Sequence, residues 1–82
     1  MDIQEALRDL IVTQFNWHGN RAELTGDYRL IEKGVIDSLG MFKIITFLED
    51  ELGFEIPDDS LMVENFETLD AIASMVTRTG AA

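Results

Sequence analysis

The sequence contains no cysteine, one histidine and one proline. Without cysteine the chain can form no disulfide, thiolate metal site or cysteine nucleophile. The single histidine, His18, would have to reach a serine, with a carboxylate behind it, to build a hydrolytic triad. It stands beside Trp17 in a segment that we expect to be a loop. The sequence lacks the ligands of a zinc site, and no segment has the alternating carboxylates of an EF-hand loop. We therefore expect neither an enzyme nor a metal protein.

Long apolar runs are also missing. None approaches the roughly 20 residues that span a bilayer. The first residues, Met1–Glu5, lack the basic and apolar parts of a secretion signal. We therefore expect a cytoplasmic protein with no membrane association.

Positive charge is scarce: 6 basic residues face 16 acidic ones, for a net charge of −10. Nucleic acid is not an expected partner, because binding it relies on Lys and Arg to neutralise phosphates. No basic residue stands between Lys43 and Arg78, whereas acidic residues recur from Glu49 to Asp70. Proteins with basic docking patches are the natural partners of such a surface, although acidity fits a merely soluble surface equally well.

What is present predicts one small helical domain, residues 1–82, acting as a monomer. The hydrophobic content of 46% is ordinary for a globular chain of 82 residues. Apolar residues at helical spacing predict a first helix that Asp2 caps and that Gly19 and Asn20 end. Its apolar positions are Ile3, Leu7, Leu10, Ile11 and Phe15.

Residues 17–37 show no sustained period, and their scattered apolar residues predict a long loop pinned across the core. A second helix is expected over 38–52, with Asp37 and Ser38 as possible caps and Gly53 at its end. Its inward stripe would be Met41, Ile44, Ile45, Leu48 and Leu52. Its outer face would show Leu39, Phe42, Lys43, Thr46, Glu49 and Asp50.

Pro57 prevents continuation, and the following Asp58–Ser60 can start a short third helix that carries Leu61, Met62 and Val63. Thr68 is expected to cap a last helix, and Thr77–Ala82 to form a frayed tail. The predicted fold is an all-α bundle of three longer helices and one short third helix.

Ser38 is the residue whose setting suggests chemistry. A serine at a helix start is ordinarily a cap. This one follows a long irregular loop, opens the longest predicted helix and stands beside apolar Leu39. A primary hydroxyl there would be accessible to a partner enzyme, and an attached phosphate would lie near the positive end of the helix dipole. The carboxylate of Asp37 would oppose that phosphate unless solvent or a metal ion screens it.

The order of motifs resembles the acyl and peptidyl carrier protein family over the whole chain. The residues that carry the resemblance are Gly34-Val35-Ile36-Asp37-Ser38-Leu39, the helix from Met41 to Leu52, Phe54-Glu55-Ile56-Pro57-Asp58, and Glu64-Asn65-Phe66-Glu67-Thr68-Leu69-Asp70-Ala71-Ile72. Asp-Ser-Leu alone is a weak signal, but the ordered set in a short acidic chain is a strong one.

The resemblance implies a free-standing, non-catalytic carrier that takes 4′-phosphopantetheine on Ser38 from a phosphopantetheinyl transferase, with Asp37 and Leu39 flanking the recognition point. The arm's thiol would hold an acyl or aminoacyl thioester, loaded by one enzyme and delivered to downstream synthases or tailoring enzymes. Tethering the cargo in this way raises its effective concentration. The resemblance also implies that partners read Leu39, Phe42, Lys43, Thr46, Glu49 and Asp50.

Gly40 departs from fatty-acid carriers, which often have an acidic residue after Asp-Ser-Leu. Together with Phe42, Lys43 and the run 65–69, it looks more like carriers of polyketide or nonribosomal peptide synthesis. Primary fatty-acid synthesis stays open, as does an unmodified acidic adaptor that binds a basic partner. Gly40 itself suits either the close approach of a partner or tight packing.

Overall fold

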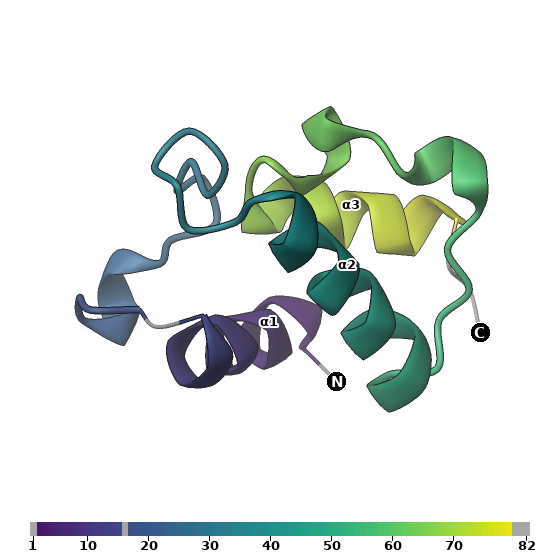
Figure 1. The fold of residues 1–82 in the computed structure, drawn as a ribbon. Helices are drawn as coiled ribbons and strands as arrows, with labels where there is room; N and C mark the ends of the chain where they lie inside the picture. Colours follow the sequence, from purple (N-terminus) through teal and green to yellow (C-terminus); the bar gives the residue numbers. More distant parts are fainter. Residues whose placement is uncertain (1, 16, 80–82) are drawn as a thin grey trace.

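Helices form the frame of the molecule (Figure 1). The computed structural model describes residues 2–15 and 17–79. Its three α-helices are α1, Ile3–Gln14; α2, Ser38–Thr46; and α3, Leu69–Thr79. A π-helical segment, Phe47–Glu51, extends α2. Shorter 3-10 turns occur at Arg21–Glu23, Asp58–Ser60 and Val63–Phe66. No strand occurs within these described ranges, so the predicted all-α, acyl-carrier-like fold is confirmed.

The first helix begins where the sequence predicts and ends earlier. The Asp2 carboxylate accepts hydrogen bonds from the amides of Gln4 and Glu5, which confirms it as the cap. The helix stops at Gln14, so the prediction that Gly19 and Asn20 end it is wrong. Phe15 leaves helical geometry, and its ring turns toward the start of α2.

The segment between α1 and α2 is a loop fixed to the core, as predicted. Leu24, Leu30 and Ile36 are almost fully buried. The amide of Leu30 donates to the carbonyl of Glu67, and the amide of Asp70 donates to the carbonyl of Gly26. These bonds attach the loop to the start of α3, so the chain that leads into α2 is held at several points.

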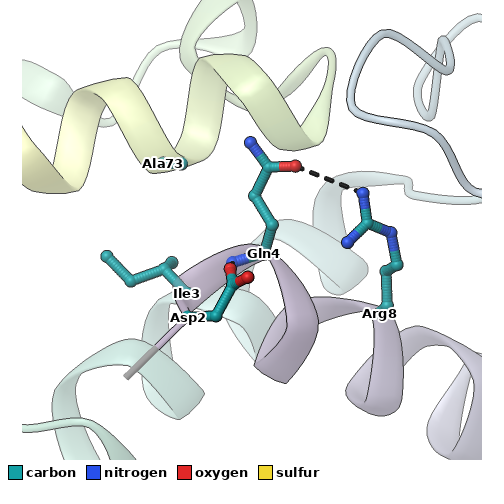
Figure 2. Close-up of a pocket in the computed structure, with 5 residues that line it drawn as sticks. All are labelled: Asp2, Ile3, Gln4, Arg8 and Ala73. Carbon is teal, nitrogen blue, oxygen red and sulfur yellow. Dashed lines mark hydrogen bonds between the residues drawn. The ribbon is translucent and has the colours of Figure 1, made fainter.

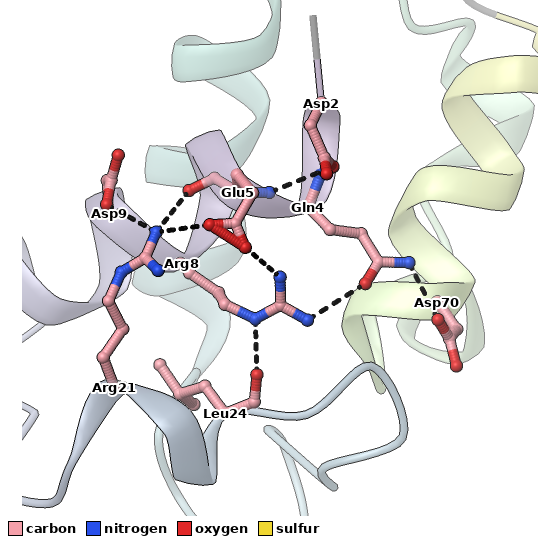
Figure 3. Close-up of polar contacts among 8 residues, drawn as sticks. All are labelled: Asp2, Gln4, Glu5, Arg8, Asp9, Arg21, Leu24 and Asp70. Atoms are coloured by element: carbon pink, nitrogen blue, oxygen red, sulfur yellow. Dashed lines mark hydrogen bonds and ion pairs between the residues drawn. The ribbon is translucent and has the colours of Figure 1, made fainter.

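Two arginines fasten the same loop to α1 (Figure 3). Arg8 is largely covered, and its Nε donates to the Leu24 carbonyl at 2.6 Å, while its guanidinium also pairs with Glu5 at 2.8 Å. Arg21 pairs with Asp9 at 2.7 Å and with Glu5 at 2.9 Å. These two contacts raise the pKa of Arg21 above its ordinary value, Asp9 contributing most.

The second helix changes type part-way. Regular α-helix ends at Thr46, the π-helical turn follows, and Gly53 comes next with a φ of 76°, a conformation that favours glycine. In an unbroken α-helix Glu51, seven residues after Ile44, would share its face. Ile44 is fully buried and Glu51 is exposed, and the wider π turn separates the two.

The predicted short third helix is replaced by two 3-10 turns. Met62, between them, has extended backbone, with φ −119° and ψ 142°, and this residue interrupts any continuous helix. The side-chain amide of Asn65 bridges the interruption by donating to the Ser60 carbonyl at 2.8 Å. Met62 and Val63 are left half exposed.

The last helix is longer than predicted. Thr68 caps it, since its hydroxyl accepts from the Ala71 amide at 3.0 Å. Thr77 and Arg78 belong to the helix rather than to a frayed tail, and their side chains donate to carbonyls of the preceding turn. Residues 80–82 of the predicted tail lie outside the described residues. No helix within the described ranges is long and apolar enough to cross a membrane.

One hydrophobic core joins the three helices and the loop. Each fully buried aliphatic or aromatic side chain contributes about 1.5–3 kcal/mol. The core side chains are Leu7, Leu10, Ile11, Leu24, Leu30, Ile36, Ile44, Leu48, Ile56, Phe66, Leu69, Ile72, Met75 and Val76.

Candidate attachment site at the start of α2

Ser38 is exposed at the first position of α2. The approach to it is a turn in which Gly34 has a φ of 77° and donates its amide to the Ile31 carbonyl. Only glycine adopts this left-handed geometry at no steric cost, which explains the first residue of the Gly-x-x-Asp-Ser-Leu motif. Ile36 then enters the core, and the chain emerges at Asp37 and Ser38.

The cap of α2 is Asp37 and not Ser38. The Asp37 carboxylate accepts from the Gly40 amide at 2.8 Å. Within the described part of the chain, the Ser38 hydroxyl makes no hydrogen bond. The ordinary explanation for a serine at a helix start, capping, therefore does not apply here. The arrangement leaves a solvent-facing primary hydroxyl at the positive end of a helix, which favours an attached phosphate, whereas the neighbouring Asp37 carboxylate opposes it.

Gly40 is explained by packing. It is buried, and a Cβ at this position would lie 2.8 Å from Cε2 of Phe15 and 3.2 Å from Cγ2 of Ile36. Real Cβ atoms do not approach other atoms so closely without a shift of the neighbour. Of the two roles that the sequence allowed, tight packing accounts for this glycine, because the ring of Phe15 occupies the space of a side chain.

The outer face of α2 carries the predicted residues. All six are exposed, and two of them are large apolar side chains, Leu39 at 72% and Phe42 at 63%. Exposure of these two residues is the kind of feature that marks an interaction surface. We refer to this set as the α2 outer face: Leu39, Phe42, Lys43, Thr46, Glu49 and Asp50.

A groove between α1 and α2 adjoins this face. It consists of a hollow of about 300 Å³ beside Asp37 and Gly40 and a second one of about 490 Å³ that extends to Asp50. The two hollows are adjacent, since three residues line both: Gln14, Leu39 and Lys43. We call them together the α1–α2 groove. Its far end includes Phe47, which is the first residue of the π turn.

Sequence reasoning missed the α1 side of this groove. Gln14 and Phe15 are distant from Ser38 in the chain, and only the packing of the two helices brings them to the site. The amino group of Lys43 lies 5.7 Å from the centre of the Phe15 ring, within cation–π range. The ion pairs of the described residues are all made by Arg8 and Arg21, so Lys43 remains available to an anion.

A larger hollow, of about 760 Å³, lies between the start of α1 and α3 (Figure 2). Arg8 lines it, but its guanidinium donates to the Gln4 side chain and to the loop, so its donors are engaged. His18 is exposed in the loop, and within the described ranges no three His, Asp or Glu side chains are placed to hold a metal ion.

A small helical domain that exposes a free serine hydroxyl at a helix start has the form of a carrier, which is modified by other enzymes. The model of the phosphopantetheine attachment site family matches residues 5–76, and the chain belongs to this family. No curated protein matches the sequence. The prosthetic group of the family is 4′-phosphopantetheine, and domains of this kind are generally not catalytic. The residues present fit that group, because Ser38 offers an unengaged hydroxyl and Lys43 supplies a cation five residues further along α2.

Proposed function

We propose that Ser38 is the residue to which 4′-phosphopantetheine is attached. The observation that supports this most directly is the division of roles at the start of α2, where Asp37 caps the helix and leaves the Ser38 hydroxyl exposed. In the reaction, Ser38 Oγ attacks the phosphorus next to pantetheine in coenzyme A. The bond to the adenosine bisphosphate leaving group breaks, and the hydroxyl proton passes to the transferase or to solvent.

Once attached, the arm supplies a thiol that this cysteine-free chain lacks. An acyl or aminoacyl group bound there as a thioester is carried between enzymes without reaction at the protein itself. The protein itself then has two roles: it positions Ser38, and it provides the surface that partner enzymes recognise. Asp37 and Leu39 flank the anchor, so the transferase would contact them first.

The test is loading followed by intact mass measurement. Incubation of the apo-protein with coenzyme A and a promiscuous phosphopantetheinyl transferase should add one phosphopantetheine unit. Ser38→Ala should add none, while Ser74→Ala, at an exposed serine on α3, should load like the wild type. Because Asp37 holds the cap, Ser38→Ala should keep the helical circular dichroism spectrum. A mass gain that persists in Ser38→Ala would refute the proposal.

We propose that the α2 outer face is where partner enzymes bind. Its two exposed apolar residues provide contact area, and Glu49 and Asp50 give it a negative edge for partners with basic patches. Reversing both charges (Glu49→Lys, Asp50→Lys) should slow loading by about tenfold or more at low salt. Reversing Asp58 and Asp59, which are exposed elsewhere on the surface, is the matched control and should change the rate little.

The pathway that we favour is polyketide or nonribosomal peptide synthesis, with fatty-acid synthesis as the alternative. Packing against Phe15 accounts for Gly40, so this preference rests on Phe42, Lys43 and the run 65–69. Mass spectrometry of the protein isolated from its native cell would decide, because the attached group names the pathway. A plain fatty acyl series of increasing length would contradict our preference.

A further inference from the structure

A third hollow lies beside the α1–α2 groove, and α1 provides most of its walls. Its volume is about 450 Å³. It shares four lining residues with the larger of the two hollows that form the α1–α2 groove: Leu10, Gln14, Phe47 and Glu51. Its other lining residues all belong to α1: Ala6, Asp9 and Thr13. We call the α1–α2 groove and this hollow together the extended groove.

The two helices run antiparallel along the extended groove. At its near end Gln14 of α1 shares a hollow with Leu39, at the start of α2. At its far end Ala6 of α1 shares one with Glu51. At a rise of 1.5 Å per residue, the stretch of α1 from Ala6 to Gln14 is about 12 Å long. Apolar residues at positions i, i+4 and i+7 of a bound helix cover about 10 Å, so the extended groove has the length that three such anchors need.

The middle of the extended groove is apolar. Leu39 and Phe42 are exposed at 72% and 63%, Phe47 is half-buried, and Leu10 forms the floor. The described part of the chain contains no strand, so no sheet edge is present to pair with an extended peptide. A helix satisfies its own backbone hydrogen bonds, and an extended segment against these side chains does not. The lining therefore favours a helix as the occupant.

The far end of the extended groove is acidic. Asp50 and Glu51 line it, and the ion pairs of the described residues involve neither of them. Asp9 lies at the same end, but its carboxylate pairs with Arg21 at 2.7 Å. The near end holds one cation and one carboxylate: Lys43 and Asp37. Basic side chains of an occupant therefore belong at the far end, and a second copy of this chain, with a net charge of −10, would be repelled.

Ser38 lies outside the extended groove. It is exposed, and it lines none of the three hollows. A helix bound in the groove would therefore cover the residues beside Ser38 and leave the serine hydroxyl open to chemistry. The binding surface and the proposed attachment residue are adjacent but separate.

We propose that the extended groove binds an amphipathic helix of a partner enzyme. The apolar residues of that helix, at positions i, i+4 and i+7, lie against Leu10, Phe42 and Phe47, and its basic residues meet Asp50 and Glu51. This inference rests on the proposed partner-binding role of the α2 outer face, to which it adds α1 as a second wall. It does not depend on attachment at Ser38.

Nuclear magnetic resonance with a synthetic peptide tests the inference. The probe is a helical peptide of about 18 residues with leucine at i, i+4 and i+7 and lysines near one end. On its addition, the amides of Thr13 and Gln14 on α1 and of Phe42 and Phe47 on α2 should shift several-fold more than that of Ser74 on α3. A scrambled peptide of the same composition keeps the charge and loses the apolar face, so its shifts should be much smaller.

A pair of variants isolates the charge of the far end. Glu51→Lys and Glu55→Lys change the net charge of the protein equally, and both positions are exposed. Glu51 lines two of the three hollows and Glu55 lines none of them. Glu51→Lys should weaken binding of the peptide about fivefold or more, and Glu55→Lys less than about twofold. Titration of the amide shifts gives both affinities.

The outcomes separate this inference from the proposed functions. Shifts confined to Phe42 and Thr46, with unchanged α1 amides, would overturn it and leave the α2 outer face as a binding surface. Shifts on neither helix would contradict both. Equal shifts with the scrambled peptide, or equal effects of the two lysine variants, would show charge attraction alone and overturn it as well. Sedimentation of the protein without peptide should show a monomer, since a dimer with broadened α1 amides would assign the groove to a second copy. Attachment at Ser38 is measured independently by intact mass.

Discussion

Gly40 of α2 and Phe15 at the end of α1 are in direct contact, and the aromatic ring occupies the volume that a side chain at position 40 would need. The site helix is thereby seated on α1 within one turn of the proposed attachment residue. The contact also explains why α1 ends before the glycine that the sequence suggested, because Phe15 has to turn toward α2.

The contact predicts an effect of Gly40→Ala that depends on residue 15. Alanine normally stabilises a helix by up to about 1 kcal/mol relative to glycine. Overpacking against Phe15 costs about 1–3 kcal/mol, so the net change should be a loss of about 1 kcal/mol. In a Phe15→Leu background the same substitution should become neutral or stabilising. Urea unfolding of the four proteins measures this, and equal effects in both backgrounds would contradict the role of the ring.

The cap at Asp37 predicts that two substitutions of this residue differ in their effect on stability. Asp37→Ala should lower the free energy of unfolding by about 1 kcal/mol, because the Gly40 amide loses its acceptor. Asp37→Asn should lose only a few tenths, since asparagine caps helices about as well. The midpoint of urea denaturation gives both values. If asparagine proved as damaging as alanine, the negative charge rather than the hydrogen bond would be the stabilising feature.

The two arginines that hold the loop should differ in importance. Arg8→Ala leaves the Leu24 carbonyl without its partner and should cost about 1–3 kcal/mol. Arg21→Ala removes ion pairs that are open to solvent and should cost less stability than Arg8→Ala. Thermal unfolding of the two variants compares them directly. A larger loss of stability in Arg21→Ala than in Arg8→Ala would show that the surface ion pairs hold the loop, and not the hydrogen bond to the Leu24 carbonyl.

Acidic self-repulsion predicts stabilisation by salt. Exposed carboxylates recur from Glu49 to Asp59, and the ion pairs of the described residues lie elsewhere, at α1 and the loop. Screening should therefore raise Tm by a few °C as sodium chloride rises from about 10 mM to 150 mM, where the Debye length is about 8 Å. Calorimetry at fixed pH measures it. An unchanged or lower Tm would show that the repulsion has no net effect on folding.

Much of the helical frame was predictable from local patterns. Asp2, Asp37 and Thr68 are short polar side chains that precede apolar residues at helical spacing, and each of them is a cap in the structure. The loop over 17–37 was predicted from its lack of period, and its buried residues were visible as isolated apolar positions. Exposure of Ser38 and of the α2 outer face followed from the same helical spacing.

The remainder depends on contacts between distant segments. The π turn at Phe47–Glu51 has no local signature, because it arises where Glu51 is kept out of the face that buries Ile44. The interruption at Met62 likewise depends on how the segment crosses the core, and α3 continues over Thr77 and Arg78 beyond its buried residues Met75 and Val76. The α1–α2 groove could not be predicted from the sequence either, because one of its walls belongs to α1, which is distant from α2 in the chain.

The burial of Ile36 and Gly40, two residues before and two residues after Ser38, has a further consequence. With both neighbours fixed in the interior, the proposed attachment residue would act as a stationary anchor, and the reach of a cargo attached there would be set by the length of the arm alone. A partner enzyme with catalytic residues at the bottom of a deep tunnel must have a tunnel no longer than the arm. The backbone around Ser38 cannot move toward the enzyme to compensate for an arm that is too short. Shortened synthetic analogues of the arm should consequently be attached normally and yet fail at partners with deep tunnels.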